Sequence, residues 1–411
     1  MRILLTNWTR RRVGGTETYL GRITALIAGR GHDIGFAYEV DAPADRAEIP
    51  LPDSTLFAIG DGRDEALDRI RTWKPDVIYA HGMVDAGTEE RLLEIAPSVF
   101  FAHAYYGTCI SGEKTHKFPV IQPCDRVFGP ACLALFYPRR CGGISPVTMM
   151  REYARQRARL ALLRRYDAVL THSAHMRREF LRHGAAGGRV LNCSYTVSGA
   201  DRTTLTTPLP DPHVPAAPWH LMFMGRMDRL KGGEYLIDAL PRVQAETGQA
   251  LRVTFAGDGP ARPDWESRAH QLTTQTSQIE VEFTGWLQHS QLAAVLGTTD
   301  LVVMPSLWPE PYGLAGPEAN RRGIPVVAFA TGGIPEWLLD GVNGCLAPGD
   351  PPTVDGLAGA IVRCLRSLAA GDTLREGAAS VGNSLADDVH VDALLEILGD
   401  VAGHPRRSVN A

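Results

Sequence analysis

The stretch TTLTTPLPDPHVPAAPW, residues 203–219, divides the sequence into two halves that share one internal pattern. Its proline and threonine content favours a connection between domains. Short apolar runs alternate with helical patterns before this stretch and again after it. We therefore expect an N-terminal domain over residues 1–205, a linker over 206–219 and a C-terminal domain over 220–385. A helix and tail over 386–411 are expected to pack back on the N-terminal domain.

Apolar runs predict the strands of both domains. The first half holds MRILLTNW, GHDIGFAYEV, PDVIYAH, SVFFAHAYY, DAVLTHS and RVLNCSYTV, and the second half holds HLMFMGR, LRVTFAGDG, IEVEFTGW, DLVVMPS and IPVVAFA. Strands that alternate with helices predict parallel sheets covered on both faces. The predicted fold class is α/β, with two Rossmann-like, doubly wound domains that face a central cleft. Ligands bind such sheets beyond the carboxyl ends of the strands.

Composition narrows the class of protein. The net charge of −4 gives no reason to expect nucleic acid as a partner. No apolar run is long enough to span a membrane, and MRILLTNW is too short for a signal peptide. Seven widely spaced cysteines do not form the pattern of a secreted disulfide framework. We expect a cytoplasmic protein. Only four of its basic residues are lysines and the others are arginines, so each lysine is a candidate for a specific role.

The stretch PEPYGLAGPEA, residues 309–319, places two carboxylates around a turn. Prolines keep the backbone extended around Glu310, and Gly313 permits a turn into a helix that starts near Leu314. Glu318 lies about one turn into this helix, whose first amides can bind an anion such as phosphate. An anion between two carboxylates suggests a ligand with a central phosphate and hydroxyls at both ends, as in a nucleotide sugar. Two solvated surface glutamates are the alternative.

The stretch FMGRMDRLKGG, residues 223–233, places Arg226 and Lys231 after a predicted strand. Arg226 and Lys231 could neutralise the charge that grows on a diphosphate leaving group, without a metal. Two solvated surface cations are the alternative. The chain contains no Asp-x-Asp triplet, the motif with which metal-dependent sugar transferases commonly hold their ion. We therefore expect a metal-independent reaction with no cofactor beyond the co-substrate.

Three residues of the first half are weaker candidates. Gly14 and Gly15 lie between the first strand and the first helix, where the backbone could approach phosphate or substrate closely. A plain turn explains them equally well. His103 lies at the end of an apolar strand and could contact the transferred sugar or its phosphate. A core histidine with a satisfied ring is the alternative.

Two further residues of the second half follow strands. Gly257, in GDGP, and Trp286 could expose backbone groups to a nucleotide base. Ordinary turns would look the same in the sequence.

Four cysteines gather in the first half: Cys109, Cys124, Cys132 and Cys141. Zinc sites usually contain a closely spaced pair such as Cys-x2-Cys, and none is present. Buried thiols are our interpretation, while a structural zinc site and a local disulfide stay open.

A basic helix is predicted near residues 148–166. Residues 139–165 hold eight arginines and one acid, and Arg151, Arg155 and Arg159 recur every four residues. A solvated helix face is the plain interpretation. The alternative is peripheral contact with an anionic lipid or an anionic acceptor.

With these motifs in place, the chain resembles a retaining glycosyltransferase of the GT-B fold, in the family called GT4. The resemblance covers nearly the whole chain and rests on EPYGLAGPE, GRMDRLKG, GDGP and PVVAFATGGIPEWLLDGVNGCLAPGD, with GGTE and SVFFAHAYY in support. It implies a nucleotide-diphosphate sugar bound mainly by the second domain. It also implies transfer with retention of the anomeric configuration, without a covalent nucleophile.

The family assigns roles to the motif residues of the second domain. Glu318 would take the ribose hydroxyls, and Glu310 would lie against the donor sugar. Arg226 and Lys231 would hold the diphosphate together with the amides near Gly313 and Leu314. Trp286 would lie near the base.

The first domain receives the remaining roles. Gly14 and Gly15 would approach the phosphate and the acceptor, and His103 the donor sugar. The sequence departs from the family pattern at two places in the first domain, which weakens the case for donor-sugar contacts there. The family often has Asn-Gly where this chain has NCSYTV, and an acid commonly follows the histidine where this chain has Ala104.

The function predicted from the sequence is transfer of a hexose-type sugar from a nucleotide-diphosphate donor to an acceptor hydroxyl. The acceptor could be a polysaccharide, a lipid-linked sugar or a small molecule. A nucleotide-sugar epimerase or a phosphorylase of the same fold is one alternative, and a non-catalytic nucleotide-sugar-binding protein is another.

Overall fold

The computed structural model describes residues 1–44, 46–51, 53–193, 218–371, 373–384 and 387–404. Within these residues the chain divides into two compact units. Unit 1 contains residues 1–113, 126–193 and 387–404, and unit 2 contains 114–125 and 218–384 apart from the gap at 372. The expected linker, apart from Pro218 and Trp219, and the expected tail after residue 404 lie outside the described residues.

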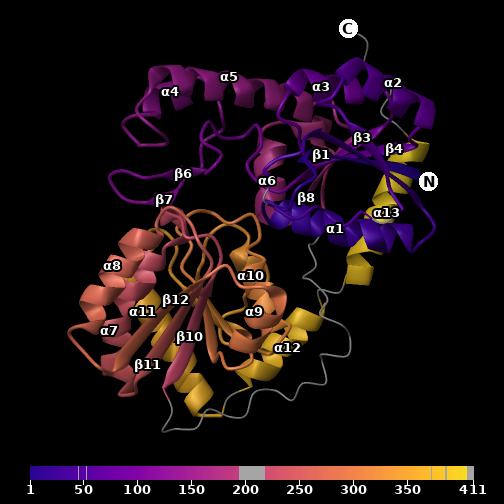
Figure 1. The fold of residues 1–411 in the computed structure, drawn as a ribbon. Helices are drawn as coiled ribbons and strands as arrows, with labels where there is room; N and C mark the ends of the chain where they lie inside the picture. Colours follow the sequence, from indigo (N-terminus) through magenta and orange to yellow (C-terminus); the bar gives the residue numbers. More distant parts are fainter. Residues whose placement is uncertain (45, 52, 194–217, 372, 385–386, 405–411) are drawn as a thin grey trace. The chain divides into compact units, whose positions relative to one another are not determined.

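Unit 1 is built on a seven-stranded parallel sheet of order β3-β2-β1-β4-β5-β8-β9 (Figure 1). The strands are β1 (Arg2–Thr9), β2 (Asp33–Val40), β3 (Thr55–Ala58), β4 (Val77–Ala80), β5 (Ser98–Ala102), β8 (Ala168–Thr171) and β9 (Val190–Asn192). The helices are α1 (Gly15–Ala28), α2 (Arg63–Trp73), α3 (Ala86–Leu92), α4 (Ala131–Leu135), α5 (Pro146–Leu163), α6 (Ala174–Arg182) and α13 (Asp387–Gly403), with a short 3-10 turn η1 (Ala185–Gly188). Strands such as β4 and β5 are buried along their whole length, as expected for a sheet covered on both faces.

Unit 2 repeats the plan with a six-stranded parallel sheet of order β12-β11-β10-β13-β14-β15. The strands are β10 (Trp219–Met224), β11 (Leu251–Ala256), β12 (Ile279–Gly285), β13 (Leu301–Met304), β14 (Val326–Phe329) and β15 (Gly344–Ala347). The helical elements are η3 (Arg229–Lys231), α7 (Gly233–Thr247), α8 (Arg262–Thr273), α9 (His289–Leu296), α10 (Ala315–Asn320), η4 (Ile334–Glu336), α11 (Val354–Ala369) and α12 (Leu374–Ser384). Two parallel, doubly wound sheets confirm the predicted α/β fold class.

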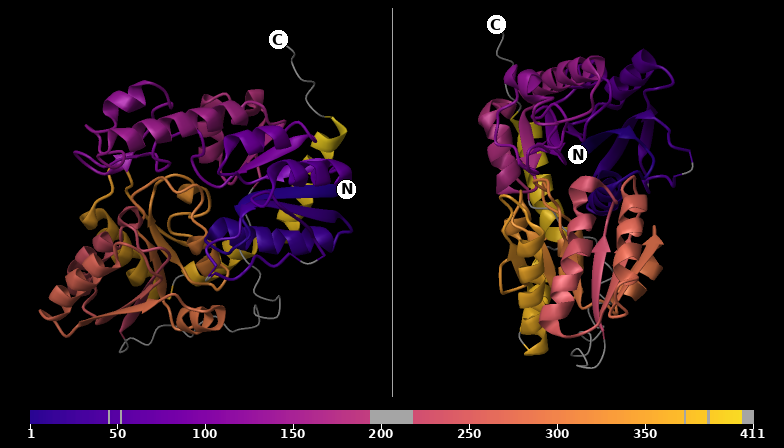
Figure 2. Two further views of the ribbon diagram at one scale, coloured as in Figure 1. Left: turned by 45° about the horizontal axis from the view of Figure 1, so that its top comes forward. Right: turned by 90° about the vertical axis from the view of Figure 1, so that its left-hand side faces the viewer.

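Two segments cross between the halves of the sequence. The short antiparallel hairpin of β6 (Thr115–His116) and β7 (Gln122–Pro123) belongs to unit 2, although it lies within the range expected for the first domain. Ile121 joins the hydrophobic core of unit 2, which explains this assignment. Helix α13 belongs to unit 1, where it contacts α1, β4 and β5 (Figures 1 and 2). No helix of the described residues is long and apolar enough to cross a membrane.

The two ends of α7 carry glycines with left-handed backbones but different surroundings. Gly232 has a φ of 70°, and a Cβ added to it would meet the carbonyl oxygen of Pro305 at 1.9 Å. Gly248 has a φ of 69°, and nothing lies within 4 Å of an added Cβ. Gly232 therefore keeps the loop before α7 in close contact with the loop after β13.

This difference predicts the stability of two matched variants. In both Gly232→Ala and Gly248→Ala the left-handed backbone costs about 1–2 kcal/mol. The Gly232→Ala variant must also move backbone, so we expect its thermal unfolding midpoint to fall at least about twice as far, by calorimetry. Equal midpoints for the two variants would contradict the close contact at Pro305.

Candidate active site

A lysine–glutamate ion pair lies beyond the carboxyl ends of β10 and β13 in unit 2. The Lys231 Nζ is 2.6 Å from the Glu310 Oε1, and the Ser306 hydroxyl donates to the same oxygen at 2.6 Å. The Lys231 Nζ also lies 5.2 Å from the ring centroid of Trp308, within the range of a cation–π contact. Glu310 is 4% exposed, whereas the Lys231 side chain keeps 31% of its surface exposed. The Lys231 ammonium group is therefore more accessible to a ligand than the Glu310 carboxylate.

The loop that carries Glu310 is held by the turn after β14. The Glu310 carbonyl accepts the Gly333 N–H at 2.7 Å, and the Thr331 hydroxyl donates to the Ser306 and Trp308 carbonyls at 3.4 and 3.3 Å. Gly332 has a φ of 61°, and an added Cβ would meet the Glu310 carbonyl oxygen at 2.2 Å. The glycines of TGGIPE thus allow two backbones to touch, which fixes the position of Glu310.

The stretch after Glu310 turns into a short helix, as expected. Gly313 has a φ of 86°, Leu314 is the N-cap, and α10 runs for six residues from Ala315. Glu318 lies in its first turn with 26% of its side chain exposed, 3.8 Å from the guanidinium of Arg322. The carboxylate is thus neither buried nor fully solvated.

A tryptophan holds this turn in place. The Trp337 indole N–H donates to the Tyr312 carbonyl at 2.6 Å. A Cβ added to Gly316 would meet the same indole ring at 1.9 Å. Gly316 therefore leaves room for the Trp337 ring, and Trp337 connects the 312–316 turn to the segment after β14.

The other predicted residues of unit 2 also lie where strands end. Arg226, two residues after the end of β10, has a side chain that is 67% exposed and 3.8 Å from the Asp228 carboxylate. Trp286, directly after β12, is 62% exposed. A Cβ added to Gly257 would meet the Gly225 carbonyl oxygen at 2.0 Å, and the Gly257 N–H donates to the Gly285 carbonyl. Packing between neighbouring strand ends thus explains Gly257 without a ligand.

In unit 1 the predicted glycine loop is held by a buried acid. The Glu17 carboxylate, 4% exposed, accepts the Gly14 N–H at 2.8 Å and the Asn7 side-chain amide at 3.3 Å. Gly14 is the N-cap of α1, and Gly15 is its first residue. Because the Gly14 amide already donates to Glu17 in the first turn of α1, it is not an open phosphate-binding group in this state.

His103 lies in a cluster of histidines and aromatic rings rather than alone. His81, His103 and His172 each follow directly after a parallel strand, and His390 comes from α13. The His81 Nδ1 is 2.8 Å from the His103 Nε2, and the His103 and His172 rings are 5.1 Å apart. The Tyr19 hydroxyl is 2.8 Å from the His390 Nε2. We call these four histidines the histidine cluster.

Burial keeps three members of the histidine cluster neutral: His81, His103 and His172. The pKa of His103 is lowered to about 3, mainly by burial and in smaller part by nearby His390. Burial also lowers the pKa of His172 well below its ordinary value, with added effects from His103, His390 and His81. The pKa of His81 is lowered for the same reasons, burial first and then His103. His103 can therefore exchange hydrogen bonds with a ligand, but it carries no positive charge at neutral pH.

The four cysteines of the first half of the sequence are divided between the two units. Cys124 belongs to unit 2, whereas Cys109, Cys132 and Cys141 belong to unit 1. Among the described residues, no group of three or more histidine, cysteine, aspartate or glutamate side chains is arranged to hold a metal ion. Cys132 and Cys141 instead pack against a small apolar cluster that includes Phe136. All four cysteines are half-buried, and the structural zinc site and the local disulfide stay predictions.

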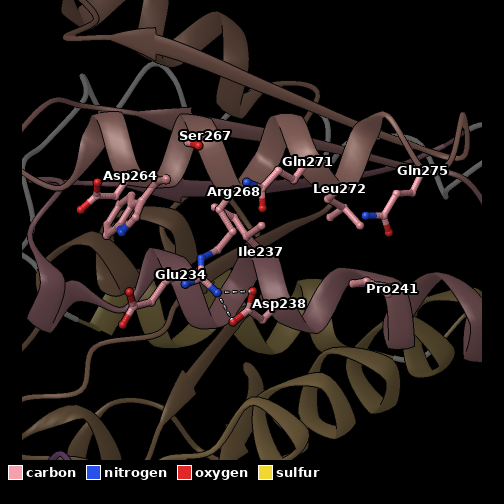
Figure 3. A pocket seen from close by; sticks show the side chains of 11 residues that line it. Glu234, Ile237, Asp238, Pro241, Asp264, Ser267, Arg268, Gln271, Leu272 and Gln275 are labelled. Atoms are coloured by element: carbon pink, nitrogen blue, oxygen red, sulfur yellow. Dashed lines mark hydrogen bonds and ion pairs between the residues drawn. The ribbon is translucent and has the colours of Figure 1, made fainter.

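A separate groove lies between α7 and α8 (Figure 3). It has a volume of about 680 Å³, and Arg268 lies in it, bound to both carboxylate oxygens of Asp238 at 2.8 and 2.9 Å. Its lining comes from the two helices and from Gln275, and it includes none of the residues predicted for the site. The groove is therefore distinct from the strand ends described above.

Comparisons with known proteins agree with this arrangement. Residues 13–191 match the profile described as Glycosyltransferase Family 4, and residues 218–367 match the one described as Glycosyl transferases group 1. The chain belongs to the GT4-type glycosyltransferases of the GT-B fold. This confirms the family resemblance seen in the motifs, which lie within the two matched ranges.

Individual relatives extend the match over most of this glycosyltransferase. It is 26% identical to the glycogen synthase of Mycobacterium tuberculosis over 406 residues, which cover 90% of this chain and 87% of that one. It is 36% identical to the D-inositol 3-phosphate glycosyltransferase of Corynebacterium kroppenstedtii over 138 residues, 32% of this chain and 30% of that one.

Among solved structures, HepE of Anabaena in complex with UDP and glucose aligns with a TM-score of 0.64 at 20% identity, covering 97% of this chain and all of that one. Sucrose-phosphate synthase of Thermosynechococcus elongatus gives 0.67 at 18% identity, covering 98% of this chain and all of that one. At these identities the likeness supports the fold.

Sequence reasoning missed several residues that the structure places beside the predicted ones. Ser306 and Trp308 stand beside the quoted stretch 309–319, and a serine directly after an apolar strand was the available signal. Glu17 lies in the GGTE motif, where its position three residues after Gly14 fits a carboxylate that reaches back to the loop amide. His390 carried no local signal, because its role depends on where α13 packs.

The histidine cluster predicts how acid affects unit 1. The pKa of His172 lies below its ordinary 6.5 in the folded state, so below that pH the unfolded chain binds a proton that the folded unit does not. The stabilisation is complete above pH 6.5 and is lost on acidification, by about 2 kcal/mol between pH 7 and pH 5 for this histidine. We expect His172→Asn to flatten the dependence of the unfolding free energy on pH by this amount.

Chemical denaturation of both proteins at several pH values measures the effect. The control is His404→Asn, because the His404 side chain is 85% exposed. An unchanged slope for His172→Asn would show that this histidine is not held neutral in unit 1.

Proposed function

We propose that this chain is a metal-independent, retaining glycosyltransferase that moves a hexose-type sugar from a nucleotide-diphosphate sugar to an acceptor hydroxyl. The ion pair of Lys231 and Glu310 carries the proposal. It joins a partly exposed cation to a buried carboxylate at the ends of parallel strands, where ligands of such sheets bind. A diphosphate next to the lysine would bring its sugar close to the glutamate.

The two cations supply the chemistry that the leaving group needs. When the bond between the sugar C1 and the phosphate oxygen breaks, the electron pair leaves with the diphosphate. Lys231 is anchored by Glu310, whereas the Arg226 side chain is 67% exposed and able to reorient. A fixed point charge and an adjustable guanidinium together would stabilise the growing negative charge.

The remaining residues would bind rather than react. Glu318 is proposed to accept the ribose hydroxyls, and the amides near Gly313 and Leu314 to contact the diphosphate. Trp286 is proposed to lie near the base. The acceptor hydroxyl would form the new bond to C1 on the face that the diphosphate leaves, and its proton would pass to the departing phosphate oxygen. Retention follows from this geometry without a covalent enzyme intermediate.

His103, Gly14 and Gly15 complete the proposal from unit 1. A neutral His103 would exchange hydrogen bonds with the transferred sugar. The glycine loop, which Glu17 holds through Gly14, would approach the phosphate and the acceptor. Gly257 is proposed only to support the strand ends near the base, because its packing against Gly225 accounts for it.

A donor screen tests the function directly. The relatives point to nucleotide-bound sugars, since HepE of Anabaena was crystallised with UDP and glucose. We expect one of the UDP, ADP, GDP or TDP sugars to raise the thermal unfolding midpoint, because a ligand that binds the native state stabilises it. We also expect nucleoside diphosphate to be released faster when the right acceptor is present. If none of the four sugars binds, the proposed function is wrong.

Substitution at the ion pair separates chemistry from stability. Lys231→Met should lower the rate of transfer by about 10²–10³-fold, because it removes a charge that stabilises the leaving group. It should also destabilise unit 2, since the buried Glu310 carboxylate loses its partner. The double variant Lys231→Met, Glu310→Gln should recover stability but not activity, by calorimetry and a product assay.

Lys74→Met is the control for loss of a lysine charge, because Lys74 is exposed and lies after α2 in unit 1. It should transfer sugar at the normal rate. Normal transfer by Lys231→Met would contradict the leaving-group role.

A further inference from the structure

An apolar surface lies on unit 1 between α4 and α5. Ile144, Val147 and Met150 are 92%, 77% and 52% exposed. They lie on the loop before α5 and on its first turns, in the part of unit 1 that extends beyond the sheet (Figures 1 and 2). We call these three residues the apolar tip. Three large apolar side chains this exposed within seven residues call for a partner.

Local packing holds the backbone around the apolar tip in a defined conformation. Ser145 caps α5 by accepting the Thr148 N–H at 3.3 Å, and Pro146 occupies its first turn. Gly142 lies so close to Phe136 that an added Cβ would meet the ring at 2.5 Å. This packing holds the loop that carries Ile144.

Helix α5 has a second apolar face, which packs against the rest of unit 1. Met149 and Tyr153 pack against a small core of Ile110, Phe128, Phe136 and Leu160. Val147 and Met150 point away from it and keep most or half of their surface exposed. The start of α5 therefore has one apolar face that completes the fold and another with no role in it.

The sequence around the apolar tip is rich in arginine and poor in acids. Residues 126–165 contain nine arginines and one acid, Glu152. The side chains of Arg151 and Arg155 are 72% and 41% exposed, and both lie near that one glutamate, at 3.7 and 3.6 Å. One carboxylate cannot balance both of these exposed guanidinium groups, so the N-terminal half of α5 carries a net positive charge.

The structure corrects one part of the basic helix. The guanidinium of Arg159 lies 4.4 Å from the ring centroid of Tyr106, and burial lowers its pKa. Arg151, Arg155 and Arg159 therefore do not form one solvated face. The exposed charge lies toward the N-terminal half of α5, on the same turns as the apolar tip.

We propose that the apolar tip and its flanking arginines dock unit 1 on a bilayer that contains anionic phospholipid. Exposed aliphatic side chains can enter the interface between headgroups and acyl chains, while arginines bind lipid phosphates. A second copy of the chain fits less well, because two surfaces of the same charge repel each other. The contact is peripheral, since no helix of the described residues can cross a membrane.

Vesicle flotation tests the apolar part, with the full chain and no sugar nucleotide, so the result does not depend on the proposed function. We expect binding to phosphatidylcholine vesicles that contain phosphatidylglycerol, and little binding to phosphatidylcholine alone. Ile144→Asp with Val147→Asp should weaken binding by at least about tenfold. Ile144→Ser with Val147→Ser removes apolar surface without adding charge and should weaken it less.

The matched control places aspartates at other exposed valines. Val84 and Val342 are 51% and 47% exposed and lie outside the α4–α5 segment. Val84→Asp with Val342→Asp adds the same charge to the chain and should leave vesicle binding unchanged. Equal loss in both pairs would show an effect of net charge and overturn the role of the apolar tip.

The charged part has its own variant. Arg151→Gln with Arg155→Gln should weaken binding by about fivefold per arginine and reduce its dependence on salt. Thermal midpoints confirm that every variant is folded, which the exposure of these residues leads us to expect. Absence of binding to anionic vesicles would overturn the proposal. So would self-association in the ultracentrifuge that the Ile144→Asp, Val147→Asp pair abolishes while vesicle binding persists.

Discussion

The contact between Lys231 and Glu310 is the interaction on which the candidate site depends. A carboxylate that is 4% exposed needs a counter-charge, and here it has a lysine and a serine hydroxyl, both at 2.6 Å. The backbone around it is adapted to this pair: Gly232 lies against the carbonyl of Pro305, and Gly332 lies against that of Glu310. These glycines bring residues that are 79 positions apart into contact, and they place a cation at the strand ends.

Unit 1 gathers histidine side chains at the ends of its strands, whereas unit 2 has an ion pair there. Three of its parallel strands are each followed directly by a histidine, and the rings pack with Tyr19 and with His390 from the C-terminal helix α13. Because burial keeps His81, His103 and His172 neutral, these three histidines can be packed without paired charges. The two units therefore offer contrasting chemistry: an ion pair with an exposed cation in unit 2, and three buried neutral histidines in unit 1.

The sequence predicted most of the fold because the signals involved are local. Alternating apolar runs located β1, β5, β10 and β13, and the glycines of PEPYGLAGPEA and TGGIPE marked turns that exist. Local signals could not show which residues meet across the fold, such as Lys231 with Glu310 or His103 with His81. For the same reason, spacing along the chain does not reveal that Cys124 belongs to a different unit from Cys109, Cys132 and Cys141. β6 and β7 have two residues each, too few for a periodic pattern.

A crystal structure of the protein with a bound nucleotide-diphosphate sugar tests the central claim most directly. The account predicts a phosphate oxygen within hydrogen-bonding distance of the Lys231 Nζ, and the sugar beside the Glu310 carboxylate. A diphosphate bound elsewhere, for example in the groove between α7 and α8, with Lys231 and Glu310 untouched, would contradict it.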